Sequence, residues 1–224
     1  MKRSQINHII EESKVYFNRM NFKLPPWAFW TPEDWKVRKT ECTEIIENKL
    51  GWDLTDFGSG IYNQTGLLLF TIRNGNPSRD KKSYAEKIMI VEENQVTPMH
   101  FHWSKMEDII NRGGGILCIE LYPSDENEEF AKHPFEVSID GIRKTMNPGD
   151  TVYLEPGESI TLYQGLYHCF YGKEGHGKVL VGEVSAGNDD NADNRFKEEV
   201  GRFPEIIEDT APTHLLVGDY TNLL

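Results

Sequence analysis

Residues 98–114 read Pro-Met-His-Phe-His-Trp-Ser-Lys-Met-Glu-Asp-Ile-Ile-Asn-Arg-Gly-Gly. His100 and His102 are two positions apart, so on a β-strand their side chains point to the same face of the sheet. Glu107 follows five residues later and can fold back toward them from a turn. Two imidazoles and a carboxylate suit a divalent metal ion, and the lack of cysteine in the cluster disfavours a closed structural zinc site. The alternative is that these are ordinary surface or packing histidines. That alternative is disfavoured by Glu107, by the glycines after it and by a further histidine downstream.

Length and composition restrict the class of protein. A chain of 224 residues favours one domain with a substantial core. It contains 24 basic and 36 acidic residues, a formal net charge of -12, which disfavours nucleic acid and anionic membranes as partners. The lack of a long apolar run or a signal-like segment predicts a soluble, cytoplasmic protein. Three widely spaced cysteines, Cys42, Cys118 and Cys169, are expected to pack in the core in reduced form.

The first fifty residues have helical character. Ser4 is expected to cap a helix that runs to about Met20. Thr31 followed by Pro32 predicts the start of a second helix that ends near Gly51. The aromatic segment 24–30 between them is expected to pack the helices onto the main body, although a pocket wall or a subunit contact is an alternative.

From about residue 60 the pattern changes to that of short strands separated by turn residues. Strands are predicted at 66–73, 84–91, 95–103, 115–122, 135–140, 151–154, 159–163, 167–171 and 178–185. Asp140-Gly141 is a hairpin signal and Asn147-Pro148-Gly149-Asp150 is a turn. The spacing predicts an all-β-dominated fold, a jelly-roll β-barrel with an N-terminal α-helical extension. One structural domain is expected, with the helical extension at 1–60, the barrel at 61–187 and a C-terminal extension at 188–224 that wraps the barrel.

The histidine cluster resembles the first motif of the cupin superfamily. In that motif a His-x-His pair is followed by a glutamate and then a glycine, as in His100, His102, Glu107 and the pair Gly113-Gly114. The second cupin motif supplies a fourth metal ligand from a Gly-x-x-His segment after a Pro-Gly-Asp turn. Residues 148–150 and 165–168 match that pattern, so the resemblance makes His168 the fourth ligand.

The helical extension, the length and the segment from Gly182 to Phe196 resemble the D-lyxose isomerases, cupin-fold sugar isomerases related to L-ribose isomerase. The resemblance implies a divalent metal, Mn²⁺ first with Zn²⁺, Co²⁺ or Fe²⁺ as alternatives. It also implies a monosaccharide substrate and interconversion of D-lyxose with D-xylulose, and of D-mannose with D-fructose.

Such a reaction needs a carboxylate base beside the metal, because a proton moves between C1 and C2 of the open-chain sugar. Glu183 shares a strand face with Val179 and Val181, which predicts a position in the barrel interior. Its spacing from His168 also resembles that of a catalytic glutamate in L-ribose isomerase, although an exposed glutamate on an edge strand is the alternative. Asp190 resembles a second acidic residue of that relative, for O1/O2 proton transfer or a sugar hydroxyl, with a turn former as the alternative.

Lysines near the motif are candidate substrate contacts. The resemblance to L-ribose isomerase makes Lys105 a catalytic contact to a substrate oxygen, against the alternative of a solvated lysine. Lys87 interrupts an apolar strand and, if it points inward, requires a carboxylate or a ligand. The same pattern equally fits a position on a sheet edge or an outward orientation of the side chain.

Further candidates lie around the motif. Asp193 and Arg195 are candidates for the distal hydroxyls, with a structural ion pair as the alternative. Trp103, with Tyr167, is a candidate apolar platform for the sugar, with core packing as the alternative.

Three other functions share the predicted metal site: a cupin-type phosphosugar isomerase, a metal-dependent cupin oxygenase and a non-enzymatic sugar-binding or storage cupin. A phosphosugar enzyme needs a cationic phosphate cluster, and none accompanies the motifs. Candidate acids near the metal favour proton transfer over the other two. A homodimer is expected, since barrels with helical arms and exposed aromatic residues often pair.

Overall fold

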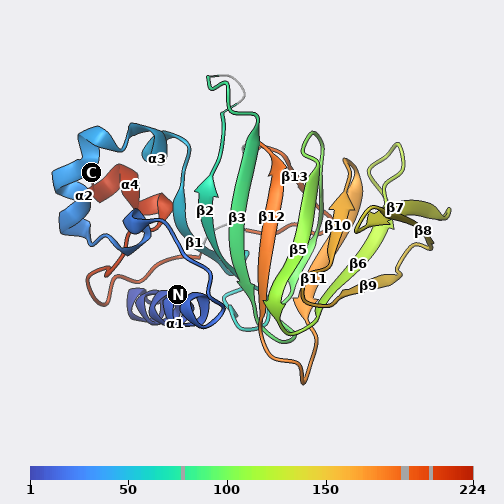
Figure 1. The fold of residues 1–224 in the computed structure, drawn as a ribbon, viewed down its shortest axis with the longest axis horizontal. Helices are drawn as coiled ribbons and strands as arrows, with labels where there is room; N and C mark the ends of the chain where they lie inside the picture. Colours follow the sequence, from blue (N-terminus) through green and yellow to red (C-terminus); the bar gives the residue numbers. More distant parts are fainter. Residues whose placement is uncertain (77–78, 188–191, 202–203, 224) are drawn as a thin grey trace.

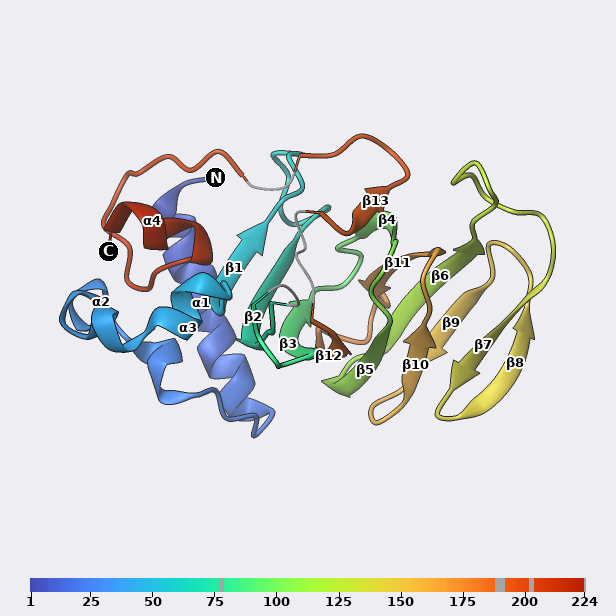
Figure 2. The same cartoon turned by 90° about the horizontal axis from the view of Figure 1, so that it is seen from above.

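The computed structural model describes residues 1–76, 79–187, 192–201 and 204–223. Its helical elements gather at one end of the molecule, where both termini also lie (Figures 1 and 2). They are α1 (Arg3–Arg19), η1 (Pro26–Phe29), α2 (Pro32–Arg38), η2 (Lys39–Glu41), α3 (Thr43–Glu47), η3 (Val217–Asp219) and α4 (Tyr220–Leu223). No helix formed by these residues is long and apolar enough to span a membrane.

The first predicted helix is present, but its cap is not the predicted one. α1 begins at Arg3, so Ser4 lies inside its first turn. The Ser4 hydroxyl instead donates to Asp209 Oδ2 at 2.7 Å, which ties the helix start to the C-terminal segment. Ile6 and Ile10 are fully buried and pack the helix on the outer face of a sheet. Burial of each isoleucine side chain is worth about 1.5–3 kcal/mol.

The second predicted helix is broken. Thr31 caps α2 as expected, because its hydroxyl accepts a hydrogen bond from the Asp34 backbone nitrogen. The helix ends at Arg38, however, and a 3-10 turn separates it from α3. Residues 39–43 include two threonines and a cysteine, which have low helix propensity. The aromatic segment between the helices packs on the main body, since the Trp27 ring centroid lies 4.8 Å from that of Phe70.

Strands dominate the rest of the described chain and form two antiparallel sheets (Figure 1). Within the described residues, the larger sheet has the order β1-β2-β3-β12-β5-β10-β7-β8 and the smaller one β13-β4-β11-β6-β9. The strands are β1 (Gly51–Thr55), β2 (Leu67–Arg73), β3 (Tyr84–Val91), β4 (Thr97–His102), β5 (Glu107–Gly114), β6 (Leu117–Pro123), β7 (Phe135–Ile139), β8 (Ile142–Met146), β9 (Thr151–Leu154), β10 (Ser159–Leu162), β11 (Leu166–Gly172), β12 (Val179–Ala186) and β13 (Asn194–Phe196).

The strand-dominated fold is therefore confirmed, and each of the nine predicted strands has an observed counterpart. Four strands were not predicted: β1, β5, β8 and β13. β5 begins with two acidic residues, which gave it the character of a turn. β8 was missed because most of its side chains are exposed and it lacks a buried face.

The inner faces of the two sheets enclose the main core. Met89, Val179 and Val181 contribute to it from the larger sheet, and Ile119 and Phe170 from the smaller one. The outer face of the larger sheet carries Phe70 and Ile88, which α1 covers. Each strand of this sheet near α1 thus has one face toward the barrel interior and one toward the helix, as its burial pattern requires.

The described residues of the C-terminal segment return to the N-terminal end of the molecule, and the expected wrap around the barrel stays a prediction. Leu216 bridges to Trp52 and so covers the edge strand β1. Arg3 is almost fully buried and pairs with Glu208 at 2.6 Å and Asp219 at 2.9 Å. Because β1 pairs with β2, the segment 1–60 contributes a strand as well as helices. The division of the chain at residues 60 and 187 stays a prediction.

The motif glycine Gly114 has a packing role at the end of β5. Its φ of +93° lies in the left-handed region, and an added Cβ would stand 2.3 Å from both the Lys178 carbonyl oxygen and the Tyr16 hydroxyl. That hydroxyl donates to the Lys178 carbonyl at 2.7 Å. Glycine at this position therefore allows α1 to approach the end of the barrel.

Candidate metal centre and cavity

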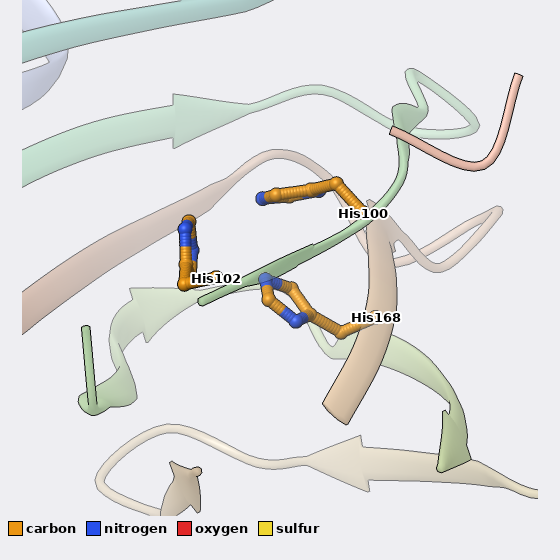
Figure 3. Close-up of side chains that lie close together, drawn as sticks. All are labelled: His100, His102 and His168. Carbon is orange, nitrogen blue, oxygen red and sulfur yellow. The ribbon is translucent and has the colours of Figure 1, made fainter. Parts of the chain in front are cut away.

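Three histidines converge between the sheets. His100 and His102 project from β4, and His168 from the neighbouring strand β11, where it pairs with His100 (Figure 3). One ring nitrogen from each lies within 4.8 Å of those of the other two. All three residues are buried. The local sequence achieves this by alternation on β4 and by the register of β11.

Backbone carbonyls fix the protonation of all three rings. Nδ1 lies 2.8 Å from the Pro98 oxygen in His100, 3.1 Å from the Asp193 oxygen in His102 and 2.9 Å from the Leu166 oxygen in His168. A carbonyl oxygen only accepts hydrogen bonds, so each Nδ1 carries the proton. In a neutral ring, each Nε2 then presents a lone pair, which is the usual arrangement of metal-binding histidines.

Two of these lone pairs have no protein partner. Nε2 of His102 and Nε2 of His168 are buried, and neither has a hydrogen-bond partner among the described residues. Leaving a buried polar atom unsatisfied costs about 1–3 kcal/mol. A divalent ion between the rings removes that cost, so the donor set fits a metal. Burial and the neighbouring His168 and His102 hold the pKa of His100 well below its usual value, which keeps its ring neutral.

Glu107 completes the cluster from the first residue of β5. Its Oε1 lies 3.3 Å from His102 Nε2 and 3.2 Å from His168 Nε2. Its Oε2 lies 2.6 Å from Lys105 Nζ. Burial alone would raise the pKa of this carboxyl, but the charge of Lys105 keeps it well below the usual value. The ionised carboxylate is the form that binds a cation.

A second carboxylate lies beside the first. Glu183 is buried on β12, in register with Lys87 on β3. Its Oε1 lies 3.2 Å from Lys87 Nζ and 3.0 Å from Lys105 Nζ, and it accepts a 3.1 Å hydrogen bond from the Ser185 hydroxyl. Lys87 thus points inward with a carboxylate partner, and Lys105 bridges Glu183 to Glu107. The exposed alternatives for Glu183, Lys87 and Lys105 are wrong.

A cavity opens onto these groups. Its wall combines the histidines, the paired lysines and carboxylates, and apolar side chains of both sheets. The lining residues are Asp53, Thr55, Phe57, Leu67, Leu69, Lys87, Met89, Thr97, His100, His102, Lys105, Glu107, Ile109, His168, Phe170, Glu183, Asn194 and Phe196.

Asp193 holds the loop at Ser104 and Lys105 beside this cavity. Its Oδ1 accepts hydrogen bonds from the Ser104 backbone nitrogen at 2.8 Å and from the Ser104 hydroxyl at 2.7 Å. Its Oδ2 accepts from the Lys105 backbone nitrogen at 2.9 Å. Both oxygens therefore hold the loop that presents Lys105, and the predicted contact of Asp193 with a sugar hydroxyl stays untested. Asp190, the second candidate acid, lies outside the described residues.

Arg195 and Trp103 both contact Glu128, and neither side chain lines the cavity. Arg195 Nε donates to Glu128 Oε2 at 2.9 Å, and Trp103 Nε1 donates to Glu128 Oε1 at 2.8 Å. On β13 the two neighbours of Arg195 line the cavity, so alternation turns Arg195 to the opposite face. Tyr167 is buried and donates to the Glu128 carbonyl oxygen. The substrate contacts proposed for Arg195 and Trp103 stay predictions that this placement does not favour.

Sequence reasoning missed several lining residues. Asp53 and Thr55 come from β1, which was assigned to the helical extension. Asn194 and Phe196 come from β13, which is too short to give a period-2 signal. Thr97 was missed because strict alternation from His100 and His102 turns it away from the cavity.

Comparisons with known proteins agree with this architecture. A family model described as D-lyxose isomerase matches residues 1–220. A D-lyxose/D-mannose isomerase of Serratia proteamaculans is 47% identical over 227 residues, covering 100% of both chains. The protein of the same name from Escherichia coli O157:H7 is 47% identical over 223 residues and covers 98% of both chains. Among solved structures, ligand-free L-ribose isomerase of Cellulomonas parahominis has a TM-score of 0.60 at 15% identity, over 92% of this chain and 98% of that one.

Proposed function

The chain belongs to the D-lyxose isomerase family and is a sugar isomerase, and on that basis we propose that it interconverts D-lyxose with D-xylulose, and D-mannose with D-fructose. The reaction moves a proton between C1 and C2 of an open-chain sugar through an enediol or enediolate. One observation supports this chemistry most directly: two buried imidazole nitrogens without partners lie beside two carboxylates that share a lysine.

His100, His102, Glu107 and His168 are the proposed metal ligands. A divalent ion in this site would polarise the sugar carbonyl and stabilise negative charge on O1 and O2. Imidazole with carboxylate suits Mn²⁺, which we propose as the physiological ion, and also Zn²⁺, Co²⁺ or Fe²⁺. The backbone bonds to each Nδ1 hold the rings in one orientation, so the site is preorganised for the ion.

Glu183 is the proposed base. The contacts from Lys87, Lys105 and Ser185 all converge on its Oε1. We assign the proton transfer to Oε2, which the same contacts orient. The carboxylate takes the proton from one carbon and returns it to the other, as general acid–base catalysis requires.

Lys105 has two proposed roles. Its ammonium lies between Oε2 of Glu107 and Oε1 of Glu183, 2.6 Å and 3.0 Å away. It therefore holds the base at a fixed distance from the metal ligands. A substrate oxygen beside this ammonium would also receive a hydrogen bond that strengthens as negative charge develops.

A phosphosugar is a less suitable substrate for this cavity. Among the described residues that line it, the lysines are Lys87 and Lys105, and both contact carboxylates. A phosphate group would compete with Glu183 and Glu107 for these ammonium groups. An oxygenase or a storage protein would have no use for the buried base. A monosaccharide without phosphate fits the charge arrangement better.

The test is a panel of free and phosphorylated aldoses incubated with Mn²⁺-loaded protein in deuterated water, with a chelated sample as the control. We expect ketose formation from lyxose and mannose, with deuterium that exchanges onto the base appearing at C1 of the ketose, and loss of conversion after chelation. Metal-loaded protein that leaves both sugars unchanged contradicts the proposal. The cytoplasmic location and the homodimer stay predictions from the sequence, and mass measurement in solution tests the dimer.

A further inference from the structure

Strand β4 contains a β-bulge next to the histidine pair. His168 pairs with His100, and Phe170, two residues further along β11, pairs with Thr97, three residues back along β4. Between these two pairs β4 therefore has two residues, Pro98 and Met99, where β11 has one. Bulges often occur beside active sites, where they redirect a side chain, and they accommodate proline, which cannot donate to the ladder.

The bulge turns Thr97 into the cavity. Regular alternation from His102 and His100 would place residue 98 on the inner face and residue 97 on the outer one. In the structure Thr97 lines the same cavity as the histidines, and Pro98 and Met99 line a separate surface pocket. The Pro98 carbonyl at the bulge accepts the bond from His100 Nδ1. One distortion thus orients a metal-binding ring and places a hydroxyl in the cavity wall.

That hydroxyl lacks a protein partner. Thr97 is 3 % exposed, and its Oγ1 has no hydrogen-bond partner among the described residues. An unsatisfied buried hydroxyl is unfavourable, so it is retained only where something binds it or where water reaches it. Because Oγ1 both donates and accepts, a hydroxyl group is its best-matched ligand.

Along β4, Thr97 lies on the side of His100 opposite His102, toward one end of the histidine cluster. Glu183, Lys87 and Glu107 belong to the larger sheet, whereas Thr97 lies on the smaller one, beyond His100. The strand positions that pair with His100 and Thr97 are two residues apart on β11, which corresponds to about 7 Å. This separation is comparable with the length of a pentose carbon chain. Its neighbour Phe170 also lines the cavity and offers an apolar surface to the carbon chain.

We propose that the Thr97 hydroxyl binds a hydroxyl group on the non-reacting carbons of the sugar and so contributes to sugar selection. This inference rests on the proposed sugar isomerisation. The bulge at Pro98 gives the interaction its geometry, because it brings the hydroxyl to the face that carries the metal-binding rings.

Three variants test the inference. Thr97→Val removes the hydroxyl at nearly constant shape, Thr97→Ser keeps it, and Thr145→Val makes the same change on the exposed strand β8 as a matched control. We expect T97V to lower kcat/KM for the preferred sugar roughly tenfold, as for loss of one hydrogen bond. T97S should retain most of the activity, and T145V all of it.

Two further readouts separate binding from a structural role. T97V should keep the wild-type Mn²⁺ affinity and a melting temperature equal to or above that of the wild type, since no protein hydrogen bond is lost. The wild type should also be assayed with monodeoxy sugars that each lack one distal hydroxyl. For one of these sugars, the wild-type kcat/KM should fall by the same factor as the kcat/KM of T97V falls with the complete sugar. For that analogue, T97V should cause no further loss.

An unchanged kcat/KM in T97V overturns the inference, and so does a similar loss for every deoxy analogue. A lower melting temperature with unchanged kinetics assigns the hydroxyl to the fold or to bound water. The proposed function is tested separately in the same experiment, because it fails if the metal-loaded wild type converts neither D-lyxose nor D-mannose.

Discussion

Asp193 Oδ2 accepts a 2.9 Å hydrogen bond from the backbone nitrogen of Lys105. The Asp193 carbonyl oxygen lies 3.1 Å from Nδ1 of His102. A single residue, Asp193, directly before β13 therefore fixes both a metal-binding ring and the loop whose lysine joins the two carboxylates. The side chain acts on Lys105, and the backbone acts on the metal site.

This division of roles predicts different effects of substitution at Asp193. Asp193→Ala removes two acceptors for the loop and leaves the backbone carbonyl in place. We expect kcat to fall by about tenfold or more through displacement of Lys105, because small misplacements of catalytic groups are costly. Mn²⁺ affinity, measured by calorimetry, should fall much less. A loss of metal affinity as large as the loss of kcat would contradict this assignment.

Glu183→Gln tests the base directly. The amide keeps the size of the side chain but cannot take a proton, so kcat should fall by about 10² to 10⁴ while Mn²⁺ binding persists. The substitution also removes the charged contact between Glu183 and Lys87, and loss of one member of a buried pair is destabilising. Turnover should therefore be measured below the melting temperature of the variant. Turnover near the wild-type value in this variant would move the role of base to another carboxylate.

Metal binding should stabilise the folded protein. The unpartnered Nε2 atoms of His102 and His168 gain a ligand only in the folded state. At an Mn²⁺ concentration 100 times Kd, the expected gain is about 2.7 kcal/mol, visible as a higher melting temperature that chelation reverses. His168→Ala should remove most of this shift. A metal-induced shift as large in H168A as in the wild type would place the ion elsewhere.

The contact of Arg3 with Glu208 predicts a pH dependence of stability. The hydrogen bond from Arg3 lowers the pKa of Glu208 below its usual value of 4.5. A carboxyl group with a lowered folded-state pKa contributes stability that is complete above its unfolded-state pKa and is lost as pH falls through the folded-state value. Glu208→Gln should therefore reduce stability at neutral pH and flatten its decline in acid. Urea unfolding from about pH 7 to about pH 3 measures both, and parallel curves for variant and wild type would exclude the contribution.

Most of the fold could be predicted because most of its signals are local. Period-2 patterns located β3 and β9 with their observed ends, and the Thr31-Pro32 cap located the start of α2. The strands that escaped prediction owe their structure to neighbours. β1 lies between β2 and the C-terminal segment, and its own five residues do not reveal these distant partners.

The site could be predicted where spacing determines geometry. His100 and His102 share a face because of alternation, and Glu183 points inward for the same reason on β12. Arg195 and Thr97 depend on features that spacing does not contain. The register of β13 turns Arg195 outward, and the bulge in β4 turns Thr97 inward.

The three backbone carbonyls that hold the histidine rings have a consequence for how this cavity can diversify. Because main-chain atoms perform that task, no side-chain exchange among the remaining wall residues deletes it. Residues that face the sugar are thus free to vary while the inorganic chemistry is inherited unchanged. An engineer who seeks a new sugar preference can randomise Phe170 or Leu69 and still expect a loaded metal centre in each folded variant.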